Sequence, residues 1–231
     1  MTPTPKPRTR RTQAERREET TSRILEAAVG ELRAKGYAGF RVNEIVRVAD
    51  VSKGALTHHF PTKESLVIAA LKRIYENSHA RSTALLKSLG PTSNVYQVLD
   101  VLMQDSEAFY LGKNFAIAVT MLGVGDDVPQ LRRQVRSLSR HHRLPIEQEW
   151  LAALLRTGLP EKEARGLLFI TQSVFRGMVM RQFLRADPNY MEFTASYWRE
   201  LALAHIAKVL QDTPSAIQAI SVKSARSQAN R

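Results

Sequence analysis

Cysteine is absent from this 231-residue chain, which excludes disulfide bonds, thiolate metal sites and cysteine nucleophiles. Long hydrophobic runs are also missing, because the longest, residues 115–125, is far shorter than the roughly 20 residues that cross a bilayer. The first residues, MTPTPKPRTRR, lack the apolar middle of a secretion signal. We therefore expect a cytoplasmic protein that makes no contact with membranes.

Familiar catalytic motifs are missing as well. The sequence contains no P-loop, GxGxxG, HExxH or GxSxG pattern. Four of its six histidines form the adjacent pairs His58–His59 and His141–His142, and neighbours on a helix diverge by about 100°, which makes them poor joint metal ligands. These absences predict a protein that is not an enzyme and holds no metal or cofactor, although an unidentified small-molecule effector is compatible with them.

Positive charge is in excess and unevenly placed. The formal net charge of +12 predicts attraction to a polyanion. The first 63 residues hold 13 Lys or Arg against 7 Asp or Glu, so about a quarter of the chain carries half of the excess. A hydrophobic content of 43% suits a globular protein with a substantial core. Abundant Leu, Ala, Arg and Glu, without a convincing strand, favours an all-α fold.

The stretch RVNEIVRVADVSKGALTHHFPTK, residues 41–63, predicts two short helices joined by a tight corner. The first helix covers residues 42–49, the corner 50–52 and the second helix 53–60, with apolar residues on one shared seam. The outer face of the second helix holds small or hydrogen-bonding residues and no acid, namely Lys53, Gly54, Ala55, Thr57, His58 and His59. Such a face suits a DNA major groove; the alternative is an ordinary helical hairpin with a polar outside.

Composition divides the chain into four parts. Residues 1–14 mix prolines with basic residues and predict a disordered basic arm. The arm could follow phosphates or enter a minor groove, or it could be a solvated terminus without a role in binding. We expect a helix-turn-helix DNA-binding domain over residues 15–63 and a larger helical ligand-binding and dimerisation domain over residues 64–211. Residues 212–231 predict a disordered tail.

Helix start and stop signals place the individual helices. The first should run from Glu15 to Lys35 and stop at Gly36, and Thr62 should cap a helix that ends near Leu89. Further helices are expected over residues 94–111, 114–122, 131–156, 161–185 and 189–211. Within the third of these, Pro145 should kink or divide the helix.

The predicted helix 161–185 is apolar around nearly its whole circumference. Gly177 in its middle permits close approach of another backbone. A helix of this kind lies either at the centre of its own domain or against a second subunit. Together with the amphipathic helix 189–211, it predicts a homodimer interface.

A cavity between helices of the larger domain would be the usual place for a small ligand. Candidate lining residues are Met103, Phe109, Tyr110, Phe115, Met121, Trp150, Phe169, Gln172 and Arg176. Each of them could equally be an ordinary core residue. Gln172 and Arg176 lie one turn apart in an apolar helix, where they could hold an anionic head group or pair across the dimer.

With these residues in view, residues 24–71 resemble the DNA-binding domain of the TetR family of one-component transcriptional regulators. The resemblance is carried by KGY after the first helix, by VSKGAL and by HHFPTKESL; beyond them only the helix count and DDVPQLRRQVR are family-like. It implies an all-helical homodimer with a three-helix DNA-binding domain and a larger effector domain. The recognition surface it implies is Ser52, Lys53, Gly54, Ala55, Thr57, His58 and His59, with Lys63 on a phosphate.

Three residues depart from the family pattern. Arg41 stands where Thr or Ser usually caps the second helix, so a longer cation replaces a capping hydroxyl at this DNA contact. Asp50 stands where Gly is usual, and we expect the corner to survive because Asp tolerates the left-handed conformation. Thr57 replaces the common Tyr and loses a long phosphate reach. Lys53 could reach a guanine edge, while Thr57 and His59 suit phosphates or a thymine methyl group.

The sequence therefore predicts a ligand-released transcriptional repressor that acts as a homodimer on a pseudo-palindromic operator of double-stranded DNA. The alternative is an architectural DNA-binding protein without a small-molecule effector, in which the arm and the tail dominate binding. A helical enzyme is a third possibility, which the missing motifs disfavour.

Overall fold

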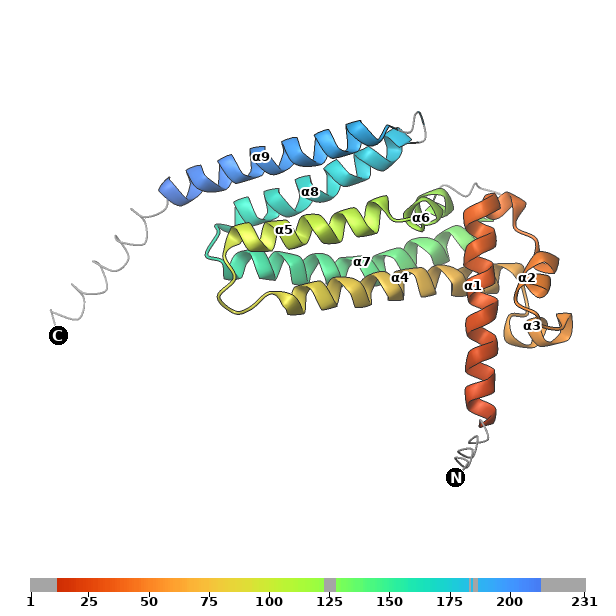
Figure 1. Cartoon of the computed structure of the whole chain (residues 1–231). Helices are drawn as coiled ribbons and strands as arrows, with labels where there is room; N and C mark the ends of the chain where they lie inside the picture. Colours follow the sequence, from red (N-terminus) through yellow and green to blue (C-terminus); the bar gives the residue numbers. More distant parts are fainter. Residues whose placement is uncertain (1–11, 123–127, 183, 185–186, 213–231) are drawn as a thin grey trace, which may run out of the picture. The chain divides into compact units, whose positions relative to one another are not determined.

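The computed structural model describes residues 12–122, 128–182, 184 and 187–212, and in these ranges the chain forms helices and no strand (Figure 1). The elements are α1 (Gln13–Gly39), α2 (Val42–Val48), α3 (Lys53–His59), α4 (Lys63–Ser88), α5 (Val95–Ser106), the π-helical turn η1 (Glu107–Leu111), α6 (Phe115–Leu122), α7 (Pro129–Arg156), α8 (Glu161–Gln182) and α9 (Pro188–Asp212). The all-α fold is confirmed. The predicted arm, apart from residues 12–14, and all but the first residue of the predicted tail lie outside the described residues.

The chain divides into two compact units, and the first contains the predicted helix-turn-helix. Unit 1 comprises the chain up to Asn77 together with Lys113–His142. Its core is built from α1 to α4, α6 and the first half of α7, through Ile24, Leu32, Phe40, Ile45, Leu56, Leu66, Leu71, Ile117, Met121, Leu131 and Val135. The unit therefore extends beyond the expected range 15–63, because α6 and α7 supply apolar side chains to the same core.

Unit 2 comprises Ser78–Gly112 and the chain from Arg143 onward. The unit buries the carboxyl group of Asp105, a residue that is 3% exposed. This carboxyl group accepts hydrogen bonds from the Ser82 hydroxyl at 2.6 Å and from the Trp150 indole N–H at 2.9 Å. Because a buried carboxyl group is costly without donors, these two bonds connect α4, α5 and α7 at a fixed place.

The first helix differs from expectation at both ends. Thr12 caps it in a reciprocal capping box, accepting from the Glu15 amide at 3.2 Å and donating its own amide to the Glu15 carboxylate at 2.7 Å. The helix consequently begins at Gln13, two residues before the predicted start. Gly36 interrupts it with a φ of 61°, as its stop signal predicted, but the chain adds one more turn to Gly39.

Three later helices also differ from expectation. α7 continues through Pro145, so the proline does not divide it. A proline removes one N–H donor, and the boundary between the two units falls close by, at His142–Arg143. α8 ends at Gln182 and not at residue 185. The predicted helix 94–111 ends in a π-helical turn, η1, which no sequence signal had indicated.

The corner between α2 and α3 has a left-handed residue at the position that the sequence indicated. Asp50 has a φ of 49°, the only positive φ of a non-glycine residue in the described ranges. The Val51 amide then donates to the Val46 carbonyl at 3.2 Å and closes the corner. The corner survives with Asp in place of Gly, as predicted, because Asp adopts this conformation more readily than most residues.

We predict that Asp50→Val lowers the free energy of unfolding by about 1–2 kcal/mol, because a β-branched side chain is strained in the left-handed region. Asp50→Gly is the matched control and should leave the free energy of unfolding unchanged or raise it. Urea unfolding followed by circular dichroism measures both variants. Equal losses would show that the Asp50 carboxylate matters and the backbone angle does not.

Candidate nucleic-acid interface

The α3 helix presents the face that the sequence pattern predicted. Ser52 is its N-cap, with the side-chain Oγ accepting from the Ala55 amide at 3.0 Å. Of the seven residues in the helix, Leu56 alone is buried, at 3% exposure. The exposed residues are Lys53, Gly54, Thr57 and His58, whereas Ala55 and His59 are half-buried. The outward surface is therefore cationic, small and free of acids.

Hydrogen bonds within the helix decide what Thr57 offers to a partner. Its hydroxyl donates to the Lys53 carbonyl at 2.9 Å. The donor is therefore used inside α3, and the groups left free are oxygen lone pairs and a methyl group. This arrangement suits contact with a thymine methyl better than contact with a phosphate, which requires a donor.

His59 connects α3 to α1. Its Nδ1 lies 3.2 Å from the Thr21 hydroxyl, which donates its proton to the Arg17 carbonyl at 2.9 Å. Because that proton is already committed, Nδ1 carries the hydrogen and donates to Thr21. Burial of the ring, and next the nearby Arg17 guanidinium and His58 ring, lower the pKa of His59 below its usual value. The ring is therefore neutral near pH 7.

Lys63 holds the start of α4 against the end of α1. Its ammonium donates to the Tyr37 carbonyl at 3.0 Å and lies 4.3 Å from the centre of the Tyr37 ring. The Tyr37 hydroxyl donates in turn to Glu64 at 3.3 Å. An ammonium has three donors, so Lys63 keeps two for a phosphate while it stabilises this junction. The predicted cap of α4 is confirmed, since Thr62 Oγ1 accepts from the Ser65 amide at 3.0 Å.

Arg41 occupies the N-cap position of α2 without capping it. No side-chain hydrogen bond satisfies the first amides of this helix. The exposed guanidinium donates instead to the Ala38 carbonyl at 3.0 Å. The departure from Thr or Ser therefore removes a cap and leaves a cation at the surface.

The nine predicted ligand-lining residues are divided between the two units. Met103, Phe109, Tyr110, Trp150 and Gln172 are buried in unit 2. Phe115 and Met121 are buried in unit 1. Phe169 is 48% exposed on α8, and Arg176 is exposed on the same helix, where it donates to the Tyr110 hydroxyl at 3.2 Å. Of Gln172 and Arg176, only Gln172 is buried, and Arg176 pairs within the chain.

The described residues contain neither a metal-binding cluster nor a membrane-spanning helix. No group of three or more His, Asp or Glu side chains lies close enough together there to hold a metal ion. Within the same ranges no helix is both long and apolar enough to span a membrane.

The comparisons with known proteins agree with this geometry. The family model described as bacterial regulatory proteins, tetR family, matches residues 24–70, which run from α1 into α4. The HTH-type transcriptional regulator CymR of Pseudomonas putida is 36% identical over 199 residues, which cover 86% of this chain and 97% of CymR. The chain belongs to the TetR family. It is therefore a DNA-binding transcriptional regulator, in a family of regulators and not of enzymes.

Solved structures share the fold. A TetR-family regulator from Cytophaga hutchinsonii aligns with a TM-score of 0.61 at 16% identity, covering 85% of this chain and 98% of that one. FadR from Bacillus subtilis, crystallised with stearoyl-CoA, aligns with a TM-score of 0.56 at 18% identity, covering 78% of this chain and 96% of FadR. At these identities the likeness shows the common architecture, and the predicted TetR fold is confirmed.

We predict that Arg41→Ser separates stability from DNA binding. Serine supplies the missing cap and should raise the free energy of unfolding by about 0.5–1 kcal/mol, while the loss of a cation lowers affinity for every duplex. Urea unfolding and titration of a fluorescent duplex measure the two effects. Arg47→Ser is the control, because Arg47 is also an exposed cation and lies outside the cap position; this variant loses a cation and its ion pair with Glu44 without gaining a cap. Unchanged affinity in Arg41→Ser would exclude a phosphate contact for Arg41.

Proposed function

We propose that this TetR-family regulator is a ligand-released repressor, a homodimer whose two α3 helices read a pseudo-palindromic operator. The observation that carries the proposal is the acid-free outer face of α3, displayed by a helix that buries only Leu56. Two such helices entering successive major grooves would lie about 34–36 Å apart. The runner-up, an architectural DNA-binding protein, lacks the specificity ratio of about 10³ or more expected of a repressor.

Within α3 we assign different roles to neighbouring residues. Lys53 is exposed in the first turn and reads a guanine edge, the contact that long cationic side chains make in the major groove. A Cβ added at Gly54 would meet only the Ser52 Oγ, at 3.9 Å, so this position lets DNA approach the backbone closely. His58 and Thr57 complete the reading face. Arg41 and Lys63 contact phosphates and position the helix without reading sequence.

We predict that Lys53→Ala and Lys63→Ala have different consequences. Lys53→Ala should weaken the binding free energy by about 1–3 kcal/mol for operators with the preferred base at one position, and it should reduce the preference for that base. Lys63→Ala should weaken all duplexes alike and also lower the free energy of unfolding, since the same ammonium binds the Tyr37 carbonyl. A preferred duplex is first selected from a randomised pool. The affinities of both variants for this duplex and for its single-base substitutions then measure the two effects. The opposite pattern would reverse the assigned roles.

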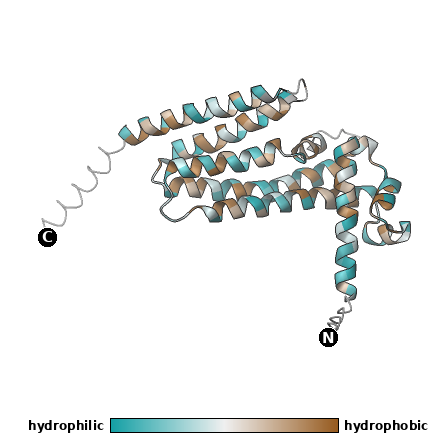
Figure 2. Cartoon of the chain, in the orientation of Figure 1, coloured by the Kyte–Doolittle hydropathy of each residue, from teal (hydrophilic) through white to brown (hydrophobic). Residues whose placement is uncertain are grey.

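The homodimer is supported by an apolar surface on unit 2. Exposed hydrophobic residues line α8 and α9, and Figure 2 shows brown segments along both helices. They are Phe169, Ile170, Met180, Phe193, Tyr197 and Leu201. The rings of Phe193 and Tyr197 stack 5.7 Å apart although they are 66% and 52% exposed. Exposed hydrophobic residues grouped on two neighbouring helices are typical of an interaction surface, so a second copy of this chain covers them in our proposal.

We predict that Gly177→Leu shifts the protein toward monomer. A Cβ at Gly177 meets no atom of this chain within 4 Å, so leucine fits the isolated subunit and crowds only a partner. Light scattering gives the mass. Gly30→Leu in α1 is the matched control, because its Cβ also has open space and the substitution adds the same side chain to a helix. An unchanged mass for Gly177→Leu would place the interface elsewhere.

Release requires an effector, and we propose that it binds in unit 2. Unit 2 buries aromatic, apolar and polar side chains, among them Met103, Tyr110, Trp150 and Gln172. FadR, which has a similar fold, was crystallised with stearoyl-CoA, and this supports a small-molecule site in this architecture. Effector binding would favour a dimer whose reading helices no longer match the operator. A coupling of about 1–3 kcal/mol is sufficient for such regulation.

A further inference from the structure

The π-helical turn η1 is a distinct feature of unit 2. It follows α5 directly and precedes α6 (Figure 1). Gly112 ends the turn with an extended backbone, and a Cβ at this position would overlap the Ala108 carbonyl oxygen. Only glycine therefore fits at the end of η1 without a shift of the backbone. Turns of this kind are rare within helical proteins and occur frequently at functional sites.

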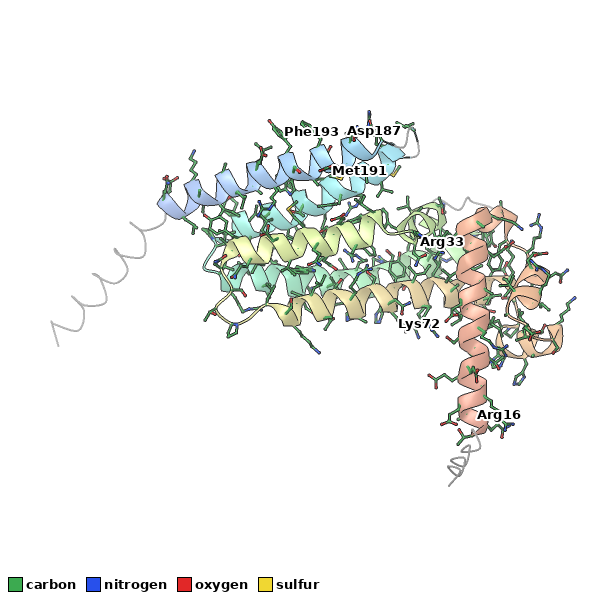
Figure 3. All side chains as sticks on the ribbon, viewed as in Figure 1. Arg16, Arg33, Lys72, Asp187, Met191 and Phe193 are labelled. Atoms are coloured by element: carbon green, nitrogen blue, oxygen red, sulfur yellow. The ribbon has the colours of Figure 1, made fainter. Side chains whose placement is uncertain are left out.

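Three arginines from three different helices contact η1. Figure 3 shows the side chains that lie between α4, α5 and α7, and α8 packs against η1 as well. Each arginine contacts a different residue of the turn. The contacts, all within unit 2, are Arg81 of α4 to the Ala108 carbonyl at 3.1 Å, Arg143 of α7 over the Phe109 ring at 3.8 Å from its centre, and Arg176 of α8 to the Tyr110 hydroxyl at 3.2 Å. We call Arg81, Arg143 and Arg176 the η1 arginines.

No acid neutralises the η1 arginines. Among the described residues, none of the three forms an ion pair with Asp or Glu. Other arginines of unit 2 do pair with acids, since Arg165 binds Glu161 and Arg199 binds Asp100. The η1 arginines therefore form a cationic cluster that the described part of the chain leaves uncompensated.

The two acids nearest in sequence do not supply the missing partner. Glu107, the first residue of η1, is exposed and pairs with no cation among the described residues. The carboxyl group of Asp105 already accepts its two hydrogen bonds from other side chains of unit 2. Arg143 is half-buried and donates no hydrogen bond within the described ranges. Removing a guanidinium from water costs free energy, which stacking on an aromatic ring offsets only in part.

The donors of this cluster suit an oxyanion. A guanidinium has five N–H donors in one plane and binds two oxygens of a carboxylate or a phosphate at once. Arg81 and Arg176 each use one donor on η1, and Arg143 uses none. Phe109 and Tyr110 are buried beside these groups, and an apolar surrounding strengthens the attraction between a guanidinium and an anion.

We propose that the η1 turn binds the anionic group of a small organic acid, with Arg143 and Arg176 as the principal donors. The chemistry is that of a carboxylate or a phosphate ester, which a guanidinium recognises in the same way. That this acid is the releasing effector rests on the proposed function; that an anion binds here does not.

The position of η1 in the chain gives such binding a route to DNA affinity. The chain passes between the two units after Asn77, after Gly112 and after His142. The turn η1 ends at the second of these crossings, and Arg143 is the first residue after the third. An anion held by Arg143 and Arg176 at η1 therefore acts on two segments that continue directly into the unit that contains the helix-turn-helix.

The first part of the test measures binding of the anion. Hexanoate, hexyl phosphate and neutral hexanamide are titrated into the full-length protein by calorimetry, at fixed ionic strength and without phosphate buffer. At least one acid should bind and the amide should not. Arg143→Gln and Arg176→Gln should each weaken binding of that acid by about 10- to 100-fold, the value of hydrogen bonds to a charged group.

The control variant is Arg156→Gln. Arg156 is an exposed residue of α7 whose side chain has no partner in the described part of the chain, so the variant loses the same charge in the same unit. It should bind the acid as the unmodified protein does. Circular dichroism verifies that each variant is folded. Because Arg176 is exposed, Arg176→Gln still decides the question if Arg143→Gln does not fold.

The second part measures release from DNA. A duplex is selected with the unmodified protein from a randomised pool, and its affinity is measured with and without the acid that binds. The acid should weaken duplex binding by about 5- to 150-fold for the unmodified protein and for Arg156→Gln. For Arg143→Gln and Arg176→Gln, duplex binding without the acid should be unchanged, and the same concentration of acid should have little effect on it.

Each other result has a definite meaning. If neither acid binds, or if both arginine variants bind it as tightly as the unmodified protein, the inference is overturned and the proposed repressor stands. Weaker duplex binding by these variants without acid would place the arginines on DNA, and a changed mass in light scattering would place them at a subunit interface; both overturn it. Binding without release overturns the effector role. If the unmodified protein selects no duplex, the proposed function fails, while calorimetry still decides whether the anion site exists.

Discussion

A helix of seven residues does not hold its shape alone in water, so α3 depends on what surrounds it. Burial of Leu56 in the core of unit 1 fixes one side of the helix, and the Ser52 cap fixes its first turn. Asp50 sets the entry angle through its left-handed backbone. The position of the outward face of α3 is thus determined by Leu56, Ser52 and Asp50. The role proposed for Lys53 depends on this support.

Features determined within one helical turn were predictable from the sequence. The Thr62 cap, the break at Gly36 and the left-handed Asp50 follow from local side-chain chemistry and backbone preference, and the structure contains all three. Hydrophobic periodicity likewise placed the helices to within a few residues at most ends. The start of α1 was predicted two residues too late, although Thr12 and Glu15 have the spacing of a capping box. Residues 1–14 had been assigned to the arm because prolines and basic residues dominate that segment.

Features that depend on distant parts of the chain were not predictable. His59 and Thr21 are 38 residues apart in sequence, and nothing local indicates their contact. Side chains of α6 and α7 belong to the same core as α1 to α4. The sequence did not indicate this, because the hydrophobic pattern of a helix does not identify the core against which the helix packs. Arg176 was expected to be buried because its neighbours in sequence are apolar. It lies at the surface, because one side of α8 is exposed although that side also holds apolar residues.

The division of labour within α3 has an evolutionary consequence. Leu56 and Ser52 maintain the helix, while Lys53, Gly54 and His58 face outward, and a side chain at position 54 would meet only one atom within 4 Å. Substitutions at these outward positions therefore change the free energy of unfolding little, and selection for stability does not remove them. After gene duplication, two copies of such a scaffold can diverge toward different promoters by exchanging a few surface residues, without passing through a misfolded ancestor.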